Sequence, residues 1–534
     1  VFDHNVYVLC GDGDMMEGIS SEAASLAGHL KLSNLCWIYD DNRISIEGPT
    51  RITFTEDVAA RFLGYGWNVA RVSDANDLEM LTCGYQIFLD THDRPTLVIV
   101  QSHIGYGAPH KQDTREAHGE PLGAQEARLA KEFYGWDPDA QFYIPDGVAA
   151  HFKQQLGRRG AVARAAWAKL FAAYRRQYPD LADQIDRMQC RDLPDGWESA
   201  LPTYSADAKG MATRDSSGKV LNAIAAKMPW LLGGAADLSP STKTHLNFDF
   251  AGEFQSPGEE GNYRGRNFHF GIREHAMCAI ANGLSLLKLR PYASSFLIFT
   301  DYCRAALRLS AMMDLPVIYI WTHDSISMGE DGPTHQPIEQ LASFRAMPGM
   351  IVLRPADANE VVEAWRVIMR VKDHPVSLVL TRQALVTLDR SKYAPASGVS
   401  RGAYVLADAP DHRPDVLLLA TGSEVSLCIA AFEKLKSEAI KARVISMPSW
   451  ELFENQNREY RDSVLPPEIT ARVAVEEAST FGWERYAGLD GTILGLHTFG
   501  LSAPIKVVAQ HFGFYPAHVV AAAKEQMARH AAKQ

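Results

Sequence analysis

Hydrophobic residues along the chain form short unbroken runs separated by segments with helical spacing. Two runs, residues 6–10 and 35–39, stand near the start, with apolar residues at helical spacing between them. An unbroken apolar run of this length is typical of a strand buried on both faces of a parallel sheet. We therefore predict a strand, a helix and a parallel second strand here, with Ser20 and Ser21 as candidate helix N-caps.

The same alternation continues to the end of the chain and predicts an α/β fold. Helical, Ala- and Arg-rich sequence from about residue 148 to 188, broken at Tyr178-Pro179, predicts a solvated connector. Three consecutive α/β domains with mainly parallel sheets are expected: residues 1–190 with the connector, 205–392 and 400–534. Further strand candidates are residues 96–101, 230–232, 316–321, 350–353, 376–380, 473–476 and 493–496. The last domain shows few convergent polar groups, so no chemistry of its own is predicted for it.

Polar residues follow the first two strands at the point where each strand ends. A right-handed crossover brings the carboxyl ends of both strands to one edge of the sheet, so Asp12 and Asn42 become neighbours. With the backbone carbonyl of Ile44 they supply three oxygen ligands of the kind that Mg²⁺ prefers. Gly11 and Gly13 leave room for a diphosphate against the backbone. A lone Gly-Asp-Gly can also be an ordinary acidic turn, but its pairing with an Asn-terminated strand favours the metal site.

Two segments resemble the thiamine-diphosphate signature, and in particular that of the transketolase family. They read GDGDMMEGISSEAASLAG and YDDNRISIEG. The resemblance covers the whole chain. It implies the thiamine-diphosphate-binding fold twice, followed by a C-terminal transketolase domain. It also implies bound thiamine diphosphate and a Mg²⁺ or Ca²⁺ ion at Asp12, Asn42 and Ile44. Many thiamine-diphosphate enzymes have paired asparagines where this chain has Asp41-Asn42. The cofactor contacts implied in this part are Gly11, Gly13, Glu17, Asn42, Ile46 as a wedge under the thiazolium ring, and His118.

A polar segment rich in Gly, His and Lys, residues 102–123, follows the predicted strand 96–101. A loop at the carboxyl end of a strand is well placed for ligand contact. Taken alone, His118 in this loop is more simply explained as an exposed histidine. The resemblance instead implies that His118 lies near the cofactor diphosphate and the substrate and takes part in catalysis.

Glu274 precedes an apolar helical pattern, where a carboxylate is favoured by the helix dipole or by pairing with Arg273. The resemblance implies a catalytic role, a hydrogen bond to the aminopyrimidine N1′ of the cofactor, which requires a protonated carboxyl and hence a raised pKa. Phe296, Phe299 and Tyr302 follow at helix-like spacing. Such a stripe is usually core, whereas the resemblance implies the pocket that buries the aminopyrimidine.

The segment WTHDSISMGEDGPTHQP follows a predicted strand and carries polar and turn residues that a core would not contain. By resemblance, Asp331 accepts a hydrogen bond from the C2 hydroxyl of an aldose, and His335 holds the ketose hydroxyls as a catalytic residue. A sugar phosphate also needs cationic contacts, for which Arg is suited. Four residues match the family's phosphate-binding positions in order, although each alone would be a weak signal. They are Arg214, Ser241, His323 and Arg382.

Composition and charge limit the class of protein. The 534 residues are 46% apolar and 22% charged, enough for several cores, and the net charge of -11 argues against nucleic acid as the main partner. Seven scattered cysteines without CxxC spacing fit reduced thiols in the cytoplasm. No apolar run is long enough to span a membrane, and we expect no leader because the opening residues lack a charged-then-apolar pattern. Because Val1 is not a start methionine and a strand follows at once, we expect that a preceding segment was removed or is supplied by another chain.

The resemblance implies a transketolase activity. This is the reversible transfer of a two-carbon ketol unit from a ketose phosphate to an aldose phosphate, a reaction of the pentose phosphate pathway and Calvin cycle type. The family's active unit is a homodimer with its active sites at the subunit interface. Two alternatives stay open: a dihydroxyacetone synthase-like enzyme, and a catalytically silent transketolase-like fragment if the preceding segment is required.

Overall fold

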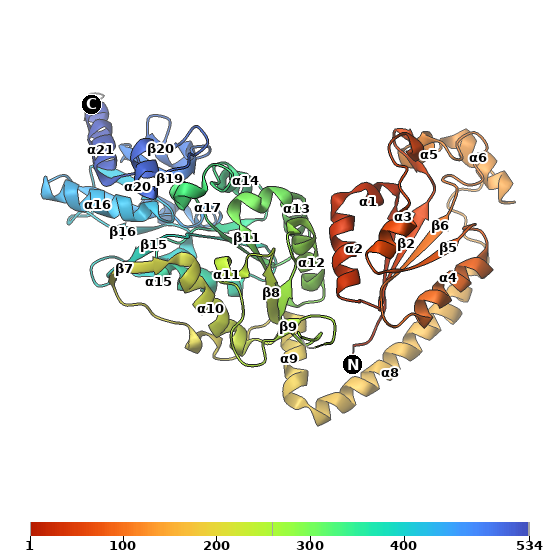
Figure 1. The fold of residues 1–534 in the computed structure, drawn as a ribbon. Coiled ribbons are helices and arrows are strands. Elements are labelled where there is room, and N and C mark those ends of the chain that lie inside the picture. Colours follow the sequence, from red (N-terminus) through yellow and green to blue (C-terminus); the bar gives the residue numbers. More distant parts are fainter. Residues whose placement is uncertain (1, 259, 532–534) are drawn as a thin grey trace. The chain divides into compact units, whose positions relative to one another are not determined.

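The computed structural model describes residues 2–258 and 260–531. The chain separates into two compact units, Val1–Ile185 and Asp186–Gln534. Figure 1 shows the elements of each unit in sequence order. No helix within the two described ranges is long and apolar enough to cross a membrane.

The first unit is built on a parallel four-stranded sheet with the order β1-β2-β6-β5. Gly11 lies opposite Asp40 in the register of β1 and β2, so the two strands end side by side. The predicted strand, helix and strand are therefore confirmed. The strands are β1 (Val6–Gly11), β2 (Leu35–Asp41), β5 (Asn68–Val72) and β6 (Thr96–Gln101), with a small hairpin of β3 (Ile44–Ser45) and β4 (Gly48–Pro49). The helices among them are α1 (Asp12–Met16), α2 (Gly18–His29), η1 (Thr50–Ile52), α3 (Val58–Gly64) and α4 (Leu78–Asp90).

Two local predictions in this unit are wrong. Strand β1 is not buried on both faces, because it lies at the edge of the sheet; Leu9 is 81% exposed. The helical segment that follows β1 begins at Asp12, ahead of the predicted N-caps, and it breaks at Glu17, whose backbone is extended. Ser20 and Ser21 consequently lie inside α2 and do not cap it.

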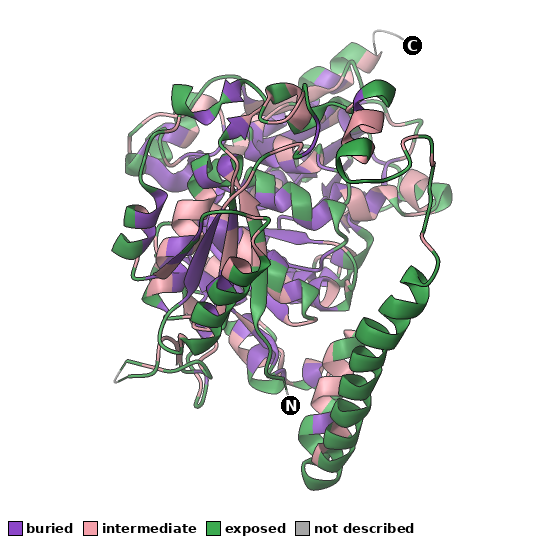
Figure 2. Ribbon diagram, turned by 90° about the vertical axis from the view of Figure 1, so that its right-hand side faces the viewer, coloured by how far each residue is buried: buried purple, intermediate pink, exposed green. Residues whose placement is uncertain are grey.

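The polar segment after β6 and the connector are largely helical. His118, predicted in a loop, lies in the short helix α5 (Arg115–Gly119), which is followed by α6 (Ala124–Phe133). The connector comprises α7 (Val148–Phe152), the π-helical turn η2 (Lys153–Gly157), α8 (Arg158–Gln177) and α9 (Pro179–Cys190). Figure 2 shows α8 exposed along its length, which confirms a solvated helical connector with a break at Tyr178.

The second unit contains a parallel seven-stranded sheet with the order β13-β14-β12-β11-β8-β10-β9. Its strands are β8 (Leu231–Ala235), β9 (Glu253–Phe254), β10 (Asn267–His269), β11 (Arg290–Phe296), β12 (Ile318–Thr322), β13 (Ile351–Leu353) and β14 (Val376–Leu380), beside an antiparallel pair of β7 (Asp207–Ala212) and β15 (Ala384–Thr387). The helices are η3 (Trp197–Ala200), α10 (Thr213–Lys227), α11 (Ser239–Thr242), α12 (Glu274–Leu286), η4 (Leu297–Tyr302), α13 (Arg304–Met312), η5 (Ile326–Asp331), α14 (Gln340–Arg345) and α15 (Ala358–Arg370).

The aromatic residues 296, 299 and 302 do not share one helix, contrary to the prediction from their spacing. Phe296 ends the fully buried central strand β11, and Phe299 and Tyr302 lie in the 3-10 helix η4. The reason is that RPYASSF is buried by its neighbours in the sheet although it carries no apolar run.

A five-stranded sheet completes the second unit, with the order β16-β18-β17-β19-β20 and an antiparallel edge strand β16. One cluster of buried hydrophobic residues extends over both large sheets. The α/β class with mainly parallel sheets is thus confirmed, while the domain boundaries stay a prediction. The strands are β16 (Tyr404–Ala407), β17 (Val416–Ala420), β18 (Ala442–Ser446), β19 (Arg472–Ser479) and β20 (Thr492–Leu496). The helices are η6 (Ala396–Arg401), α16 (Glu424–Ser437), α17 (Trp450–Glu454), α18 (Arg458–Val464), α19 (Glu484–Ala487), α20 (Ile505–Phe512) and α21 (Pro516–Ala531).

Candidate functional site

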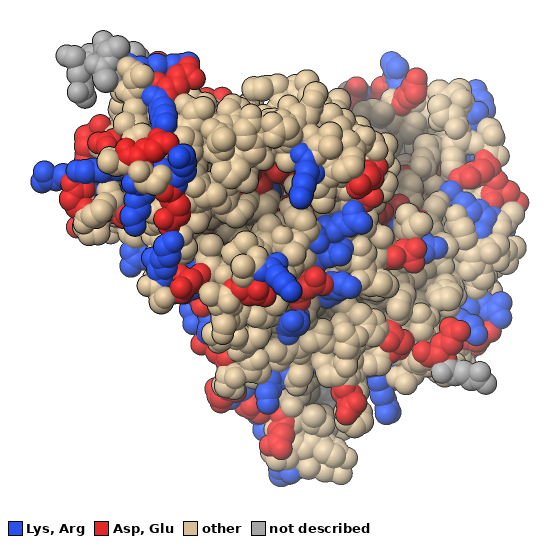
Figure 3. Space-filling model, turned by 60° about the vertical axis from the view of Figure 1, so that its left-hand side comes forward, with Lys and Arg blue, Asp and Glu red and all other residues tan. Residues whose placement is uncertain are grey.

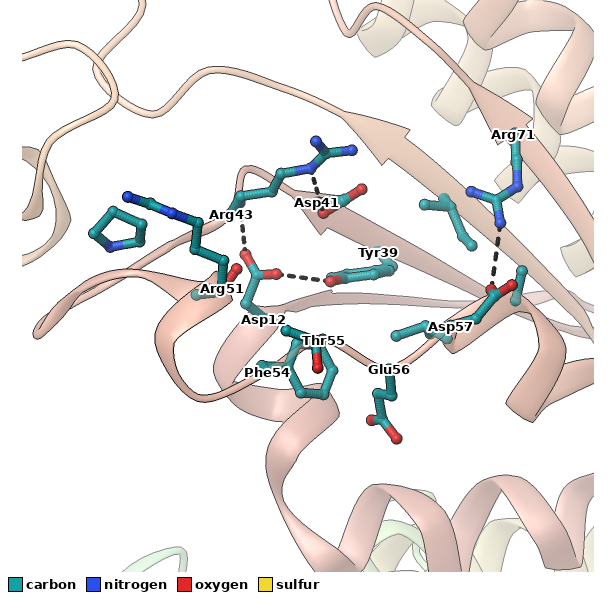
Figure 4. Close-up of a pocket in the computed structure, with 15 residues that line it drawn as sticks. Asp12, Tyr39, Asp41, Arg43, Arg51, Phe54, Thr55, Glu56, Asp57 and Arg71 are labelled. Carbon is teal, nitrogen blue, oxygen red and sulfur yellow. Dashed lines mark hydrogen bonds and ion pairs between the residues drawn. The ribbon is translucent and has the colours of Figure 1, made fainter.

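In the first unit, the predicted metal residues meet where β1 and β2 end. Asp12 is 4% exposed and accepts two hydrogen bonds: its Oδ1 from the Tyr39 hydroxyl at 2.7 Å, and its Oδ2 from the Arg43 backbone N–H at 3.0 Å. Figure 4 shows both contacts. Arg43 stands between Asn42 and Ile44, so its bond to Asp12 ties all three predicted ligands into one network.

The electrostatics of Asp12 suit a bound cation. Burial raises the pKa of Asp12, and the neighbouring carboxylates of Asp41 and Asp40 raise it further, against the hydrogen bonds from Tyr39 and Arg43. A divalent ion beside this carboxyl would stabilise its charged form, and would so offset the effects of burial and of the neighbouring carboxylates. A metal site is therefore chemically consistent with the residues present.

Asn42 and Ile44 form a turn that supports the same site. The Asn42 Oδ1 accepts the Ile44 N–H at 3.0 Å, and its Nδ2 donates to Asp40 Oδ2 at 3.2 Å. An amide oxygen has a second lone pair that remains for an ion. Arg43 has a φ of 62°, a left-handed conformation that the Asn42 turn and the Asp12 contact hold in place. Among the described residues, no group of three or more His, Cys, Asp or Glu side chains is placed to hold a metal. A site here would depend on amide and carbonyl oxygens beside one carboxylate.

The other residues predicted in this unit are open to solvent. A Cβ atom at Gly11 or Gly13 would meet nothing within 4 Å, so the backbone there is free to be approached. Ile46 is 74% exposed. His118 and Glu17 are exposed as well, His118 on α5, a helix that packs against β3.

Two cavities flank this edge of the sheet, and the sequence did not point to their basic residues. A cavity of ≈ 450 Å³ is lined by Asp12, Tyr39, Arg43, Arg51 and Arg71, among others (Figure 4). A second, of ≈ 640 Å³, includes Asn42, Ile44 and Arg51 in its lining. Several arginines beside a candidate metal suit a diphosphate. The sequence could have pointed to Arg43, because this residue immediately follows the predicted ligand Asn42.

In the second unit, Glu274 occupies the first position of α12, as predicted, and is 6% exposed. Its Oε1 accepts a hydrogen bond from the Ser295 hydroxyl at 3.0 Å. Ser295 lies in β11, one residue before Phe296. Sequence reasoning missed Ser295 because it did not identify this strand.

The predicted aromatic pocket and the predicted substrate histidines lie together. The Phe296 ring stacks on His323 with centroids 3.6 Å apart, and Phe299 stacks on Phe296 at 5.7 Å. The rings of His335 and Phe299 are nearly perpendicular, with their centroids 5.5 Å apart. Tyr302 is less enclosed, at 69% exposed and 6.3 Å from Phe299.

The four predicted phosphate residues converge on the same place. An Nη atom of Arg214 donates to the backbone oxygen of Ser241 at 2.9 Å and to its hydroxyl at 3.3 Å. Arg382 forms an ion pair of 3.3 Å with Asp331. The pKa of His323 is lowered to about 3, mainly by burial and in addition by the neighbouring Arg214, Arg382 and His335. A neutral His323 thus sits within the field of both arginines.

The depressed pKa of His323 gives a testable dependence of stability on pH. The unfolded histidine has a pKa of 6.5 and the folded one about 3, so between these values the unfolded chain binds more protons. The contribution of His323 is complete above 6.5 and is lost as the pH falls toward 3. We expect the Tm difference between the wild type and His323→Asn to shrink from about pH 7 to about pH 4. A constant difference, measured by calorimetric scans, would contradict the buried neutral state.

Sequence comparisons match the chain to known domains along most of its length. The thiamine diphosphate binding domain of transketolase matches residues 1–194, the transketolase pyrimidine binding domain 209–387, and the transketolase-like C-terminal domain 402–515. The transketolase of Geobacillus stearothermophilus is 50% identical over 521 residues, which are 97% of this chain and 77% of that protein. The transketolase of Bacillus subtilis is 45% identical over 521 residues, with the same coverage.

Solved structures agree with the sequence comparisons. The transketolase of Pichia stipitis in complex with sedoheptulose 7-phosphate superposes with a TM-score of 0.94 at 40% identity, covering 99% of this chain and 77% of that one. The transketolase of Campylobacter jejuni gives a TM-score of 0.87 at 37% identity, covering 97% and 77%.

Proposed function

The chain belongs to the transketolase family, and on this premise we propose that the residues described above carry out its two-carbon transfer from a ketose phosphate to an aldose phosphate. The convergence in the second unit carries the proposal. There the buried carboxyl of Glu274 is bonded to Ser295, the residue before Phe296, and the Phe296 ring stacks on His323. The charges of two arginines act on the same histidine. An acid, an apolar ring surface and cations are the groups that a thiamine cofactor and a sugar phosphate require.

The first unit supplies the proposed anchor for the cofactor diphosphate. Asp12, Asn42 and the carbonyl of Ile44 would hold Mg²⁺ or Ca²⁺, and the open backbone at Gly11 and Gly13 would accept the phosphates. When bound, thiamine diphosphate supplies the carbon chemistry of C–C cleavage and formation. Ile46, Glu17 and His118 are further proposed contacts, and all three are exposed.

Glu274 is proposed to donate a hydrogen bond to the aminopyrimidine ring. The Ser295 hydroxyl donates to Oε1 of Glu274 and so orients the carboxyl. Glu274 is 6% exposed, and a protonated carboxyl is the form that could donate to the ring. Phe296 and Phe299, with Tyr302 at the rim, would cover the ring and exclude water.

The sugar phosphate is proposed to lie along the polar side of this pocket. Asp331 would accept a hydrogen bond from the C2 hydroxyl of the aldose, and its ion pair with Arg382 orients it. His335 would hold the ketose hydroxyls and move a proton during cleavage. The phosphate would meet Arg214, Ser241, His323 and Arg382.

The choice of acceptor tests this function against its close alternative. We expect ribose 5-phosphate to be a much better acceptor than formaldehyde, because the arginines have no partner in formaldehyde. The measurement is kcat/KM for both acceptors with one ketose phosphate donor. A clear preference for formaldehyde would indicate a dihydroxyacetone synthase-like enzyme. No heat of thiamine diphosphate binding in calorimetry with Mg²⁺ would indicate a silent protein.

We propose further that the active unit is a cytoplasmic homodimer in which the first domain of one subunit and the second domain of the partner share a cofactor. The cysteines among the described residues are free thiols, in keeping with a reducing compartment. On the face seen in Figure 3, basic and acidic side chains are interspersed, so that face offers no uniform surface to a polyanion.

Mixing two inactive variants tests the shared site. Asp12→Asn and Glu274→Gln proteins, unfolded and refolded together in equal amounts, should recover about a quarter of wild-type activity. The reason is that half of the dimers are mixed, and each mixed dimer has one site with both native residues. If each site were built from one subunit, no mixture would be active. Each variant refolded alone is the control.

A further inference from the structure

A cluster of buried charges joins the seven-stranded and five-stranded sheets of the second unit. The sequence showed few convergent polar groups in the C-terminal domain, whereas in the structure its Glu424, Glu476 and Glu477 are each at most 5% exposed and contribute to this cluster. The cluster consists of these three with Arg345, Arg354 and Asp324, the residue that follows His323.

Arg354 is the centre of the cluster and is completely buried. Its Nε donates a hydrogen bond to Asp324 Oδ2 at 2.9 Å, and its Nη2 forms an ion pair with the same oxygen at 2.8 Å. Its Nη1 donates to the backbone oxygen and hydroxyl of Thr421, at 3.1 and 2.9 Å, and to Glu424. The guanidinium lies against Gly422, where a Cβ would come within 2.7 Å of the Arg354 Cζ. Arg354 thus bridges the loop after β12 to the loop after β17.

A second contact ties the same segment to the C-terminal domain. The Ser327 hydroxyl donates to Glu477 Oε2 at 2.8 Å, and the Glu477 N–H donates to Glu424 Oε2 at 3.1 Å. Farther along the chain, the Ser502 hydroxyl donates to the backbone oxygen of Glu330 at 2.7 Å. The segment that carries His323 and Asp331 is therefore fastened to the five-stranded sheet and its loops at several points.

His323 depends on this support. Its φ of 62° is left-handed, a conformation that a residue with a side chain keeps only when its surroundings enforce it. Among the residues that the structure describes, Asp324 Oδ1 is buried without a hydrogen-bond partner, so Arg354 holds the carboxylate through Oδ2. On the other side, the His323 ring is held by Phe296 and by the Thr322 hydroxyl, 2.7 Å from its Nδ1.

We propose that Arg354 is a positioning residue for the sugar phosphate. Through Asp324 it holds His323 in its left-handed conformation. Because Thr421 and Glu424 of the C-terminal domain in turn hold Arg354, that domain sets the geometry of the phosphate end of the substrate site. The inference rests on the proposed phosphate contacts of His323. Arg354 itself would not touch the substrate.

The expected effect is a loss of binding that depends on the phosphate group. In Asp324→Asn the amide keeps the shape but loses the charge that Arg354 binds, and in Arg354→Lys the planar fork is lost. A displacement of about 1 Å at a binding residue can change rates by about 100-fold. We expect KM for ribose 5-phosphate to rise by about 10-fold or more, and KM for unphosphorylated ribose to stay unchanged. A folding defect would reduce kcat for both acceptors equally.

Controls separate this inference from the proposed function. Arg390→Lys alters another buried ion pair, 2.8 Å from Asp357, which does not contact the substrate segment; its KM ratio for the two acceptors should equal that of wild type. His323→Asn should raise KM for ribose 5-phosphate selectively. If it does not, the proposed phosphate site is wrong; if it does and Asp324→Asn does not, only the role of Arg354 is wrong. If both cluster variants fail to fold, Ser327→Ala, which removes the bond to Glu477, replaces them. A ratio of KM for ribose 5-phosphate to KM for ribose equal to that of wild type would then contradict the role of the cluster.

Discussion

Replacing Glu274 by glutamine is expected to lower kcat by about 100- to 10,000-fold, the usual contribution of a positioned general acid or base. Glutamine keeps the volume and the place at the start of α12, and it can still donate an N–H. It cannot give up or take a proton, however, and the proposed exchange with the aminopyrimidine ring requires both. Steady-state kinetics with a ketose phosphate and ribose 5-phosphate measure the effect.

The neighbouring hydroxyl provides a graded control for Glu274. Ser295→Ala removes the 3.0 Å bond to Oε1 and leaves the carboxyl in place, so its effect on kcat should be much smaller. Both variants should bind thiamine diphosphate in calorimetry, which shows that the pocket is intact. A Glu274→Gln enzyme with near wild-type kcat would exclude Glu274 as the proton-carrying group.

Replacing Asp12 by alanine is expected to weaken thiamine diphosphate binding in the presence of Mg²⁺ by at least about 100-fold, since even outer contacts to a metal contribute up to that factor. Asp12 is the only carboxylate among the three proposed ligands. Titration calorimetry with Mg²⁺ and the cofactor measures the change. Asp41→Asn is the matched control, because Asp41 pairs with Arg43 at 3.6 Å and is not a proposed ligand.

The raised pKa of Asp12 adds a dependence on pH. The ion binds the charged carboxylate, so its affinity should fall as the pH is lowered toward this pKa, and binding should then release protons. Without the ion, the chain loses stability as the pH rises through the raised pKa, and the ion restores it. Equal binding heats in buffers of different ionisation enthalpy at low pH would contradict a protonated Asp12.

The sequence predicted the strands whose own residues are apolar. Residues 96–101 and 376–380 are β6 and β14 with the predicted bounds, because both runs are buried on two faces. Strand β11 was missed: RPYASSF carries no apolar run, and its burial comes from β8 and β12 on either side. For β1 the sequence was misleading in the other direction. Its residues form an apolar run, but the strand lies at the edge of the sheet and is partly exposed.

The candidate site divides in a similar way. Contacts set by neighbouring strand ends, such as Asp12 with Arg43 beside Asn42, follow from the crossover rule and could be predicted. The contact of Arg214 with Ser241 was expected only through the family resemblance. Asp324 with Arg354 joins two loops with no periodic pattern. Only the packing of the two sheets brings them together.

Gly422 shows how far the requirements of the substrate site extend. No ligand is proposed to reach this residue, yet even a methyl group there would displace the guanidinium that holds the turn before Ser325. Engineering that aims at new sugar acceptors therefore cannot treat the last third of the chain as inert scaffold. Changes at its strand ends would alter selectivity without touching a single pocket residue.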